Sequence, residues 1–425
     1  MSSSSSAPSA PRGLAYQGLR AYANLAQTFS RHSGDFSGSK NALLEEASAR
    51  TGLTDYGDRG FEEGLEILLE GYDDEARLNV VGRLNVRQEL LGVLSARLRL
   101  IEEWKAHPDT EKTRPQRPLF ILGLPRTGTS ALHDLLAEDP QHQVLEYWLA
   151  ASPAPRPAHG VSRRDPRLKA ARRELTAIYA LDPGLRALHD MRAEGPEECR
   201  HLFRHNFIDD TFDSMANLPS YGEWFRAQDV SPIYAWHRRA LSLVQSTAPE
   251  RRWVLKYPAH LRNLDELFEA YPDAGIIQTH RNPVDVLPSL CSLVYRLRCL
   301  YSDEVDPHAI GRWQVEMWAG ILERGLEIRK RHDPDRFHDV YFTDFQSDPA
   351  KTIHGIHGHF GGLFNEESVK RIQDYRDQHP PGRHGQHSYR AEDYGLTESM
   401  IRERFASYME AFGIEAEDGS RGLRA

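Results

Sequence analysis

Short apolar runs alternate with helical stripes over the second and larger part of this chain. Residues 118–124 (PLFILGL) contain no charged or hydrogen-bonding side chain and lead into a glycine loop, which predicts a buried parallel strand. Runs of the same kind at 252–258 and 274–283 predict two more strands, and 337–345 predicts a fourth. Apolar positions at helical spacing within 261–268 separate the second run from the third. The pattern is therefore strand–helix–strand, which indicates a parallel sheet.

The first hundred residues have a different pattern, in which apolar positions recur at helical spacing. The clearest stripe predicts a packing helix and consists of Leu90, Leu91, Leu94, Leu98 and Ile101. The acidic pair at 74–75 predicts a helix start, and 107–109 (HPD) predicts a helix end. No grouping of side chains in this part indicates chemistry.

These patterns divide the chain into a disordered polar tail (1–13), an N-terminal helical region (14–114) and an α/β domain (115–425). Residues 150–245 are mixed, aromatic and mostly helical, which is typical of an insertion that covers a ligand crevice on its acceptor side. The predicted fold class is α/β, with a P-loop-type parallel sheet flanked by helices.

Composition narrows the classes of partner. The net charge of −9 over 425 residues does not favour a general nucleic-acid or acidic-membrane surface, so an anion site has to be a local basic pocket. The three cysteines lack metal-ligand spacing, and we expect reduced thiols in a cytoplasmic protein. No signal peptide or membrane span is expected.

The first predicted strand leads into a modified phosphate-binding loop. Gly123, Gly128 and Ser130 have the spacing of a Walker A motif, but Thr129 stands where its lysine belongs, and the only cation in the loop is Arg126. The backbone amides of the loop and the following helix N-terminus suit one phosphate group. Without the lysine and without a convincing magnesium-binding aspartate, this loop suits a nucleotide whose charge is neutralised by Arg and Lys.

Two further cations follow predicted strands. Lys256 ends the second and Arg281 the third, with Ser289 eight residues on in the next helix. Because ligands of open α/β sheets bind at the carboxyl ends of the strands, these cations should meet Arg126 in one crevice and hold a second anionic group. A basic glycine loop at 380–389 (PPGRHGQHSY) is a third candidate element.

These motifs, in this order, resemble those of the sulfotransferases that use 3′-phosphoadenosine 5′-phosphosulfate (PAPS), and the run 51–396 is similar to a large bacterial branch of that family. The resemblance implies a 5′-phosphosulfate loop, a 3′-phosphate motif with a closing Arg-Lys-Gly-like segment, and a strand lysine at the transferred sulfonate. It also implies an aromatic residue near the adenine. The residues that match for nucleotide binding are Pro125, Arg126, Thr127, Gly128, Thr129, Ser130, Arg281, Ser289, Phe342, Arg383, His384 and Gly385.

The resemblance also implies in-line attack of an acceptor hydroxyl or amine on sulfur, without a metal. Arg126 and Lys256 would stabilise the charge that grows on the leaving oxygen, and a base would remove the acceptor proton. We expect His260 to be that base, since it follows Lys256 within about one helical turn, with Glu198 and Glu146 as carboxylate alternatives.

Two other functions remain open at this point. A magnesium-dependent P-loop kinase would need ATP, and a non-catalytic binding protein on a sulfotransferase fold would keep the core but lose turnover. The small-molecule acceptor (steroid, phenol, lipid, sugar or specialised metabolite) and the oligomeric state are open as well.

Overall fold

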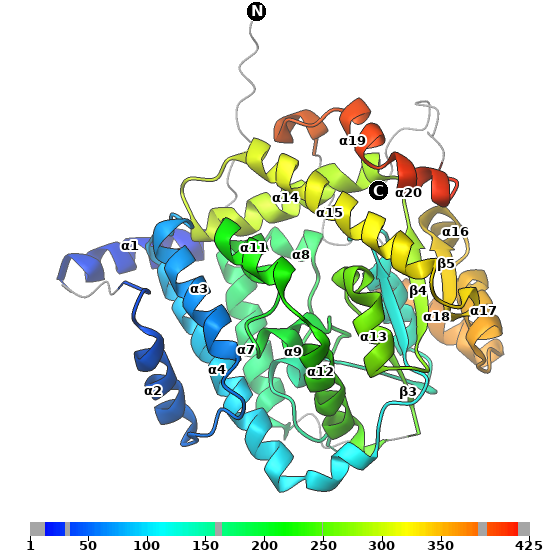
Figure 1. Ribbon diagram of the computed structural model, residues 1–425, viewed down its shortest axis with the longest axis horizontal. Helices are drawn as coiled ribbons and strands as arrows, with labels where there is room; N and C mark the ends of the chain where they lie inside the picture. The colour runs from blue at the N-terminus through cyan, green and yellow to red at the C-terminus, as the bar shows by residue number, and fades with distance from the viewer. Residues whose placement is uncertain (1–12, 30–34, 158–163, 249, 381–388, 415–425) are drawn as a thin grey trace, which may run out of the picture.

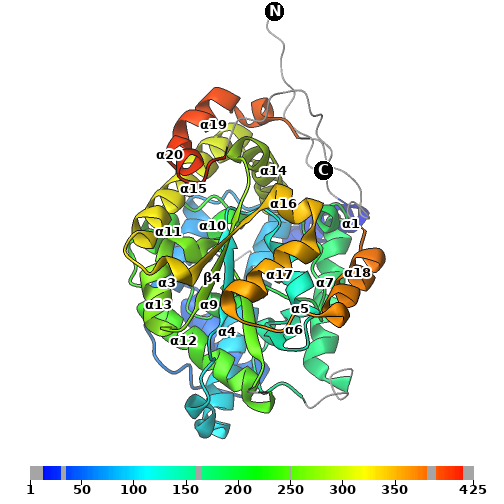
Figure 2. The same cartoon turned by 90° about the vertical axis from the view of Figure 1, so that its right-hand side faces the viewer.

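Five parallel strands form one sheet in the order β2-β3-β1-β4-β5. The computed structural model describes residues 13–29, 35–157, 164–248, 250–380 and 389–414. The strands are β1 (Leu119–Gly123), β2 (His142–Val144), β3 (Arg252–Lys256), β4 (Gly275–His280) and β5 (Phe337–Tyr341). Helices lie on both faces of the sheet, so the predicted α/β class is confirmed (Figures 1 and 2).

Alternate residues of the central strand face different helices. Leu119 and Ile121 pack with α5 (Thr129–Ala137), α16 (Phe342–Ser347) and α17 (Pro349–Phe360) in one apolar cluster. Phe120 and Leu122 belong to the larger cluster on the other face, with α12 (Ser231–Val244) and α13 (Leu264–Ala270). Burial on both faces explains why these strands are continuously apolar in sequence.

The N-terminal region consists of α1 (Leu14–Phe29), α2 (Lys40–Thr51), α3 (Phe61–Asp74), α4 (Val80–Ala106) and the 3-10 helix η1 (Pro108–Lys112). Helices α1, α2 and α3 lie at the left of Figure 1, to one side of the sheet. Their buried side chains join those of the insertion and of the sheet in one cluster without a break. The boundary at residue 114 stays a prediction.

The segment between β2 and β3 is helical. It contains α6 (Tyr147–Ala151), α7 (Pro166–Leu181), α8 (Leu185–Leu188), α9 (Arg200–Arg204), α10 (Thr211–Met215), α11 (Pro219–Ala227), α12 and the 3-10 helix η3 (Gln245–Thr247). The helices that follow β3 complete the fold around the sheet. They are the 3-10 helix η4 (Pro258–Asn263), α13, α14 (Pro283–Tyr301), α15 (Pro307–Arg329), η5 (Pro334–Arg336), α16, α17, α18 (Glu366–Gln378), η6 (Ala391–Tyr394), α19 (Glu398–Arg404) and α20 (Ala406–Ala411).

Three local expectations differ from the structure. The short edge strand β2 has no counterpart in the sequence pattern, and the predicted strand 337–345 changes to helix at Phe342. Asp74 ends α3 rather than starting a helix, and the next helix is capped by the Asn79 side chain, which accepts a hydrogen bond from the Gly82 amide. The connecting backbone is held by a tertiary contact, since the Asn79 amide donates to the Tyr301 carbonyl.

Candidate active site

The phosphate-type loop lies where β1 ends and α5 begins. The two glycines that bracket it have positive φ angles, 134° at Gly123 and 88° at Gly128, and a Cβ at Gly123 would lie 2.5 Å from the Thr279 carbonyl oxygen. Gly128 is the N-cap of α5 and provides no side-chain cap, so the first amides of the helix keep their donors for a ligand. The glycine spacing that marked the loop in the sequence therefore has a conformational cause.

Threonine side chains fix the loop to the neighbouring strand. Thr127 is buried, and its hydroxyl lies 2.6 Å from both the Leu124 carbonyl oxygen and the Thr279 hydroxyl. Arg126 itself has a φ of 67°, a conformation that costs a non-glycine residue free energy. The Thr127 contacts fix the loop to Leu124 and to β4, and such fixed positions lower the entropic cost of binding a ligand.

Arg126 and Arg281 come together as the parallel strands require. Arg281 follows β4, next to β1 in the sheet, and its guanidinium donates to the Arg126 carbonyl oxygen at 3.2 Å and lies 4.2 Å from the centre of the Phe342 ring. The Arg126 Nε donates to the Ser289 hydroxyl at 3.2 Å. Burial, together with the charge of Arg281, lowers the pKa of Arg126. Two cations this close are stabilised by an anion between them.

Lys256 joins the same site from β3. Its ammonium group is buried, donates to the Ser130 hydroxyl at 3.1 Å and lies 2.9 Å from a carboxylate oxygen of Glu198. Arg126, Ser130, Lys256, Arg281, Ser289 and Phe342 therefore gather at the carboxyl ends of β1, β3, β4 and β5. In an open α/β sheet, ligands bind outside the carboxyl ends of the strands, at the point where the strand order reverses. In this sheet that point lies between β1 and β4.

Glu198 carries a negative charge at this site. Burial alone would raise the pKa of its carboxyl, but the charges of Lys256 and Arg200 outweigh burial and hold the pKa well below its ordinary value. Arg200 approaches the second carboxylate oxygen at 2.9 Å and also donates to the Thr211 hydroxyl. The helical insertion thus brings a carboxylate into contact with the strand lysine.

His260 does not lie at this group of residues. It is in η4, fully buried, and its Nδ1 lies 2.7 Å from the Tyr234 hydroxyl. Its ring packs edge-on against Phe120, whose side chain is on the sheet face opposite to α5, and against Phe203. Burial among these rings lowers the pKa of His260 far below its ordinary value. Lys256 instead reaches toward α5, so the structure does not bring the two side chains into contact.

Glu146 has structural partners. One of its carboxylate oxygens accepts from the Trp148 indole at 2.8 Å and lies 2.9 Å from the Arg156 guanidinium. Pro125 and Thr129 lie in the loop and at the start of α5, and the predicted residues Arg383, His384 and Gly385 lie outside the described residues. Their proposed role at the 3′-phosphate therefore stays a prediction.

The buried polar residues that surround Glu198 and the neighbouring Tyr257 were not identified from the sequence. Arg200 is one of them, and the Tyr257 hydroxyl donates to Asp210 at 2.6 Å and to Asp209 at 3.2 Å. Burial and the neighbouring Asp209 charge raise the pKa of Asp210 to about 7. The run of charged residues from 197 to 210 is the signal in the sequence, but a charged stretch on a helix is more often solvent-exposed than buried.

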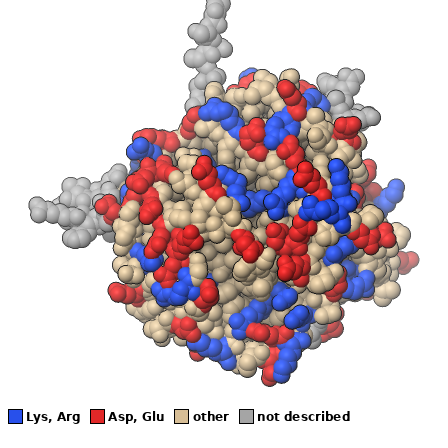
Figure 3. Space-filling model, viewed as in Figure 1, with Lys and Arg blue, Asp and Glu red and all other residues tan. Residues whose placement is uncertain are grey.

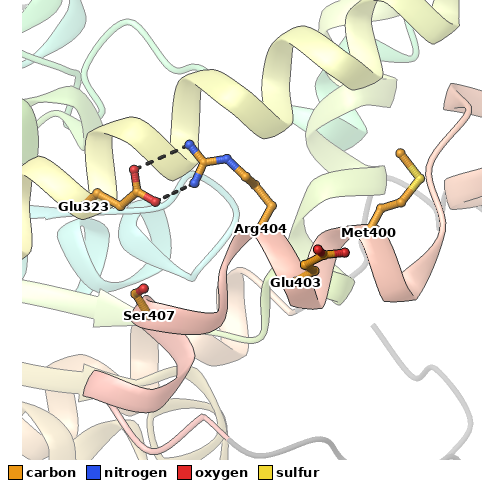
Figure 4. Close-up of a pocket in the computed structure, with 5 residues that line it drawn as sticks. All are labelled: Glu323, Met400, Glu403, Arg404 and Ser407. Carbon is orange, nitrogen blue, oxygen red and sulfur yellow. Dashed lines mark hydrogen bonds and ion pairs between the residues drawn. The ribbon is translucent and has the colours of Figure 1, made fainter.

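A cavity of about 340 Å³ on another part of the molecule does not suit a nucleotide. It lies between α15, α19 and α20, and Figure 4 shows its five lining residues. Arg404, its one cation, is already paired with Glu323 and Glu316. On the face drawn in Figure 3 acidic and basic side chains are interspersed. Among the described residues, no helix has the length and apolar content needed to cross a membrane.

The comparisons with known proteins agree with this geometry. A family model described as "Sulfotransferase family" matches residues 118–366. The crystal structure of sulfotransferase STF1 from Mycobacterium tuberculosis is 36% identical and covers 88% of this chain and 100% of its own, with a TM-score of 0.80. Sulfotransferase STF9 from Mycobacterium avium is 29% identical and covers 91% of this chain and 100% of its own, with a TM-score of 0.82.

A curated relative has a named substrate. Omega-hydroxy-beta-dihydromenaquinone-9 sulfotransferase Stf3 from Mycobacterium bovis is 25% identical over 321 residues, which are 70% of this chain and 75% of that protein.

Proposed function

This chain belongs to the sulfotransferase family and transfers a sulfonate group to a small-molecule acceptor, and we propose that its donor is PAPS, held by the loop 123–130 and by Arg281. The observation that carries the proposal is that Lys256 contacts Ser130 at the N-terminus of α5, while Arg126, in the loop that leads into this helix, contacts Ser289. Three positive groups around a glycine loop suit a phosphosulfate, whose charge they offset without a metal ion.

We propose that a second group of residues, Arg281 and Ser289, binds the 3′-phosphate of the donor. Arg281 and Ser289 come from the strand end and the helix that follow β4, and Arg126 links them to the loop through the Ser289 hydroxyl. We propose that the Phe342 ring, which lies 4.2 Å from the Arg281 guanidinium, contacts the adenine. A 5′-nucleotide without a 3′-phosphate would leave Arg281 without an anionic partner.

In this proposal the residues of the chain have separate roles. Bound PAPS supplies an activated sulfonate with a phosphate as its leaving group. Arg126, Lys256 and the amides of residues 128–130 stabilise negative charge on the oxygen that leaves, and the rigid loop orients the phosphosulfate for in-line attack.

We propose Glu198 as the base that accepts the acceptor proton. Its carboxylate lies 2.9 Å from the Lys256 ammonium group, so a hydroxyl placed against a sulfonate at Lys256 would be within its reach. A carboxylate with a low pKa is a weak base. When Lys256 turns from Glu198 toward the donor, Glu198 loses its largest stabilising charge, and its pKa rises toward the ordinary value.

The acceptor is proposed to be a hydroxyl compound. The name of the Stf3 relative identifies its acceptor as an omega-hydroxylated menaquinone, which is an alcohol on an apolar molecule. A cytoplasmic location stays a prediction from the cysteine content.

The test is transfer of labelled sulfonate from PAPS to a panel of alcohols, phenols and amines, with EDTA present during the assay. We expect transfer to at least one acceptor, and no stimulation by Mg²⁺. A strict requirement for Mg²⁺, with phosphate transferred from ATP, would overturn the proposal in favour of a kinase. Tight binding of PAPS with no turnover on any acceptor would favour a binding protein on this fold.

A further inference from the structure

A second cluster of chemically reactive side chains lies at the opposite end of the sheet. Asp139 is in the turn between α5 and β2, His142 is the first residue of β2, and His357 is in α17. All three are at least 93% buried, and one ligand atom from each lies within 4.8 Å of the other two. His142 is paired with Arg252 at the start of β3, so about 13 Å of strand separates the cluster from Lys256.

A hydrogen bond to the backbone fixes the tautomer of His142. The Nδ1 of His142 lies 2.9 Å from the Leu136 carbonyl oxygen, and because a carbonyl only accepts, Nδ1 is the nitrogen that carries the proton. The Nε2 of the same ring therefore keeps its lone pair. A histidine that binds a metal is commonly held in this tautomer by a carbonyl oxygen.

The Nε2 of His357 has no hydrogen-bond partner among the residues that the structure describes. This nitrogen is buried and lies 3.2 Å from the Oδ2 of Asp139. Two ligand atoms bound at about 2.0 Å to one tetrahedral ion are about 3.3 Å apart, which is close to this separation.

The Asp139 carboxylate is oriented by its neighbours. Its Oδ1 accepts from the backbone amide of Gln141 at 2.8 Å and from the Gln141 side chain at 3.1 Å, while the same side chain is 3.3 Å from Oδ2. Such partners hold a ligand carboxylate in place. The desolvation of three polar groups at one point is offset when a cation joins them.

We propose that Asp139, His142 and His357 bind one Zn²⁺ ion, with water as the fourth ligand. Two imidazoles and one carboxylate suit zinc, whereas Mg²⁺ and Ca²⁺ prefer oxygen ligands. The ion would join the α5–β2 turn and the edge strand to α17. Its role would be to stabilise this end of the sheet, apart from the transfer reaction.

The alternative is a metal-free ion pair between protonated His357 and Asp139, with the His142 ring stacked beside it at a centroid distance of 5.3 Å. The buried Nε2 of His357 has no hydrogen-bond partner among the described residues, and this favours the metal. The two possibilities differ in what a metal titration shows.

The experiment uses the full chain, stripped with a strong chelator and dialysed, and titrated with ZnCl₂ alone. We expect one equivalent to bind, with a thermal midpoint a few degrees higher than that of the stripped protein. His357→Gln and His142→Gln should each weaken Zn²⁺ binding at least roughly 100-fold. His354→Gln is the matched control, because this exposed histidine is in the same helix and packs on Phe364. It should bind Zn²⁺ like the unsubstituted chain.

Cobalt gives a measurement that needs no variant. Co²⁺ added to the stripped chain should produce the visible absorption of a tetrahedral site, and Zn²⁺ should abolish it. Absence of a stoichiometric Zn²⁺ or Co²⁺ site in the unsubstituted chain would overturn the proposal in favour of the ion pair. Equal Zn²⁺ affinity of His357→Gln and His354→Gln would overturn it as well.

Discussion

Arg126 combines three properties that a phosphate-binding residue needs. Its backbone adopts a left-handed conformation between two glycines, its carbonyl oxygen accepts from Arg281, and its side chain donates to Ser289. These contacts within the chain position the guanidinium. The strain of the left-handed conformation is compensated by these contacts, as is common at ligand-binding sites.

Arg281 should decide between nucleotides that differ only in the 3′-phosphate. We expect the chain to bind 3′-phosphoadenosine 5′-phosphate more tightly than adenosine 5′-phosphate by roughly 10- to 100-fold, which is what a charge-assisted pair contributes. Arg281→Ala should reduce this ratio to less than about tenfold, as measured by isothermal titration calorimetry. Arg371→Ala, at an exposed arginine of α18 paired with Glu367, is the control and should leave the ratio unchanged. Equal affinities of the unsubstituted chain for the two nucleotides would refute a 3′-phosphate site.

The base should be found by single-turnover kinetics with PAPS already bound. Glu198→Gln should slow transfer by roughly 10²- to 10⁴-fold, because the glutamine side chain cannot take the proton from the attacking hydroxyl. Binding of 3′-phosphoadenosine 5′-phosphate should be unchanged or tighter, since Lys256 then has no carboxylate competing for it. A purely structural role for Glu198 would instead weaken nucleotide binding.

His260 is the residue that the sequence suggested for the same role. His260→Gln should lower stability, because it breaks the bond with Tyr234, but the folded fraction should transfer sulfonate at a rate within a few-fold of normal. Slow chemistry in folded His260→Gln, with normal chemistry in Glu198→Gln, would return the base to His260.

At the scale of elements, α4 crosses α14 at a glycine. A Cβ at Gly82 would lie 2.1 Å from the Tyr301 carbonyl oxygen and 2.8 Å from its carbonyl carbon, so the two backbones depend on the missing side chain. Gly92, ten residues on in the same helix, has nothing within 4 Å of its Cβ position. Gly82 is in the first turn of α4 and packed against α14, whereas Gly92 is in the helix interior with open space at its Cβ position.

Alanine substitutions at these two glycines should have opposite effects. Gly82→Ala should lower the free energy of unfolding by roughly 1–3 kcal/mol through the clash with Tyr301. Gly92→Ala should raise it by about 0.5–1 kcal/mol, because alanine has the higher helix propensity. Denaturation in urea measures both. A loss of stability at Gly92→Ala equal to that at Gly82→Ala would show that the contact with α14 is not the cause.

At the scale of the whole molecule, buried histidines couple folding to pH. Burial lowers the pKa of His237 to about 3, and its ring is fully enclosed with Nδ1 at 2.7 Å from the Tyr271 hydroxyl. As the pH falls from about 6.5 toward 3, the unfolded chain takes up a proton at this residue and the folded chain does not. The stability that His237 contributes is therefore present above about pH 6.5 and is lost over this window.

The effect should appear in a comparison of variants. Burial raises the pKa of Asp213 to about 6, which acts in the opposite direction, so the total slope combines several groups. Between pH 5.5 and pH 4.5, the free energy of unfolding of His237→Gln should depend on pH less steeply than that of the unsubstituted chain, by about 1.4 kcal/mol per pH unit. Urea unfolding at several pH values tests this, and parallel curves would contradict it.

The sequence by itself determined four of the five strands, apart from the end of β5, and most of the ligand edge of the sheet. A strand buried on both faces has to be continuously apolar, and a loop that turns at positive φ needs glycine, so β1, β3, β4 and the Gly123–Gly128 spacing left a local signal. Strands that run parallel end at one edge, which is why Arg126, Lys256 and Arg281 could be placed together without coordinates.

Only the tertiary structure decided which side chains from distant segments share these positions. The insertion brings Glu198 to Lys256, and the rings around η4 enclose His260, although His260 is nearer to Lys256 in sequence. Likewise, His357 meets Asp139 only because α17 packs against the edge strand. Sequence separation reports neither the face of the sheet that a side chain occupies nor the charges that surround it, and these decide the pKa values of the candidate groups.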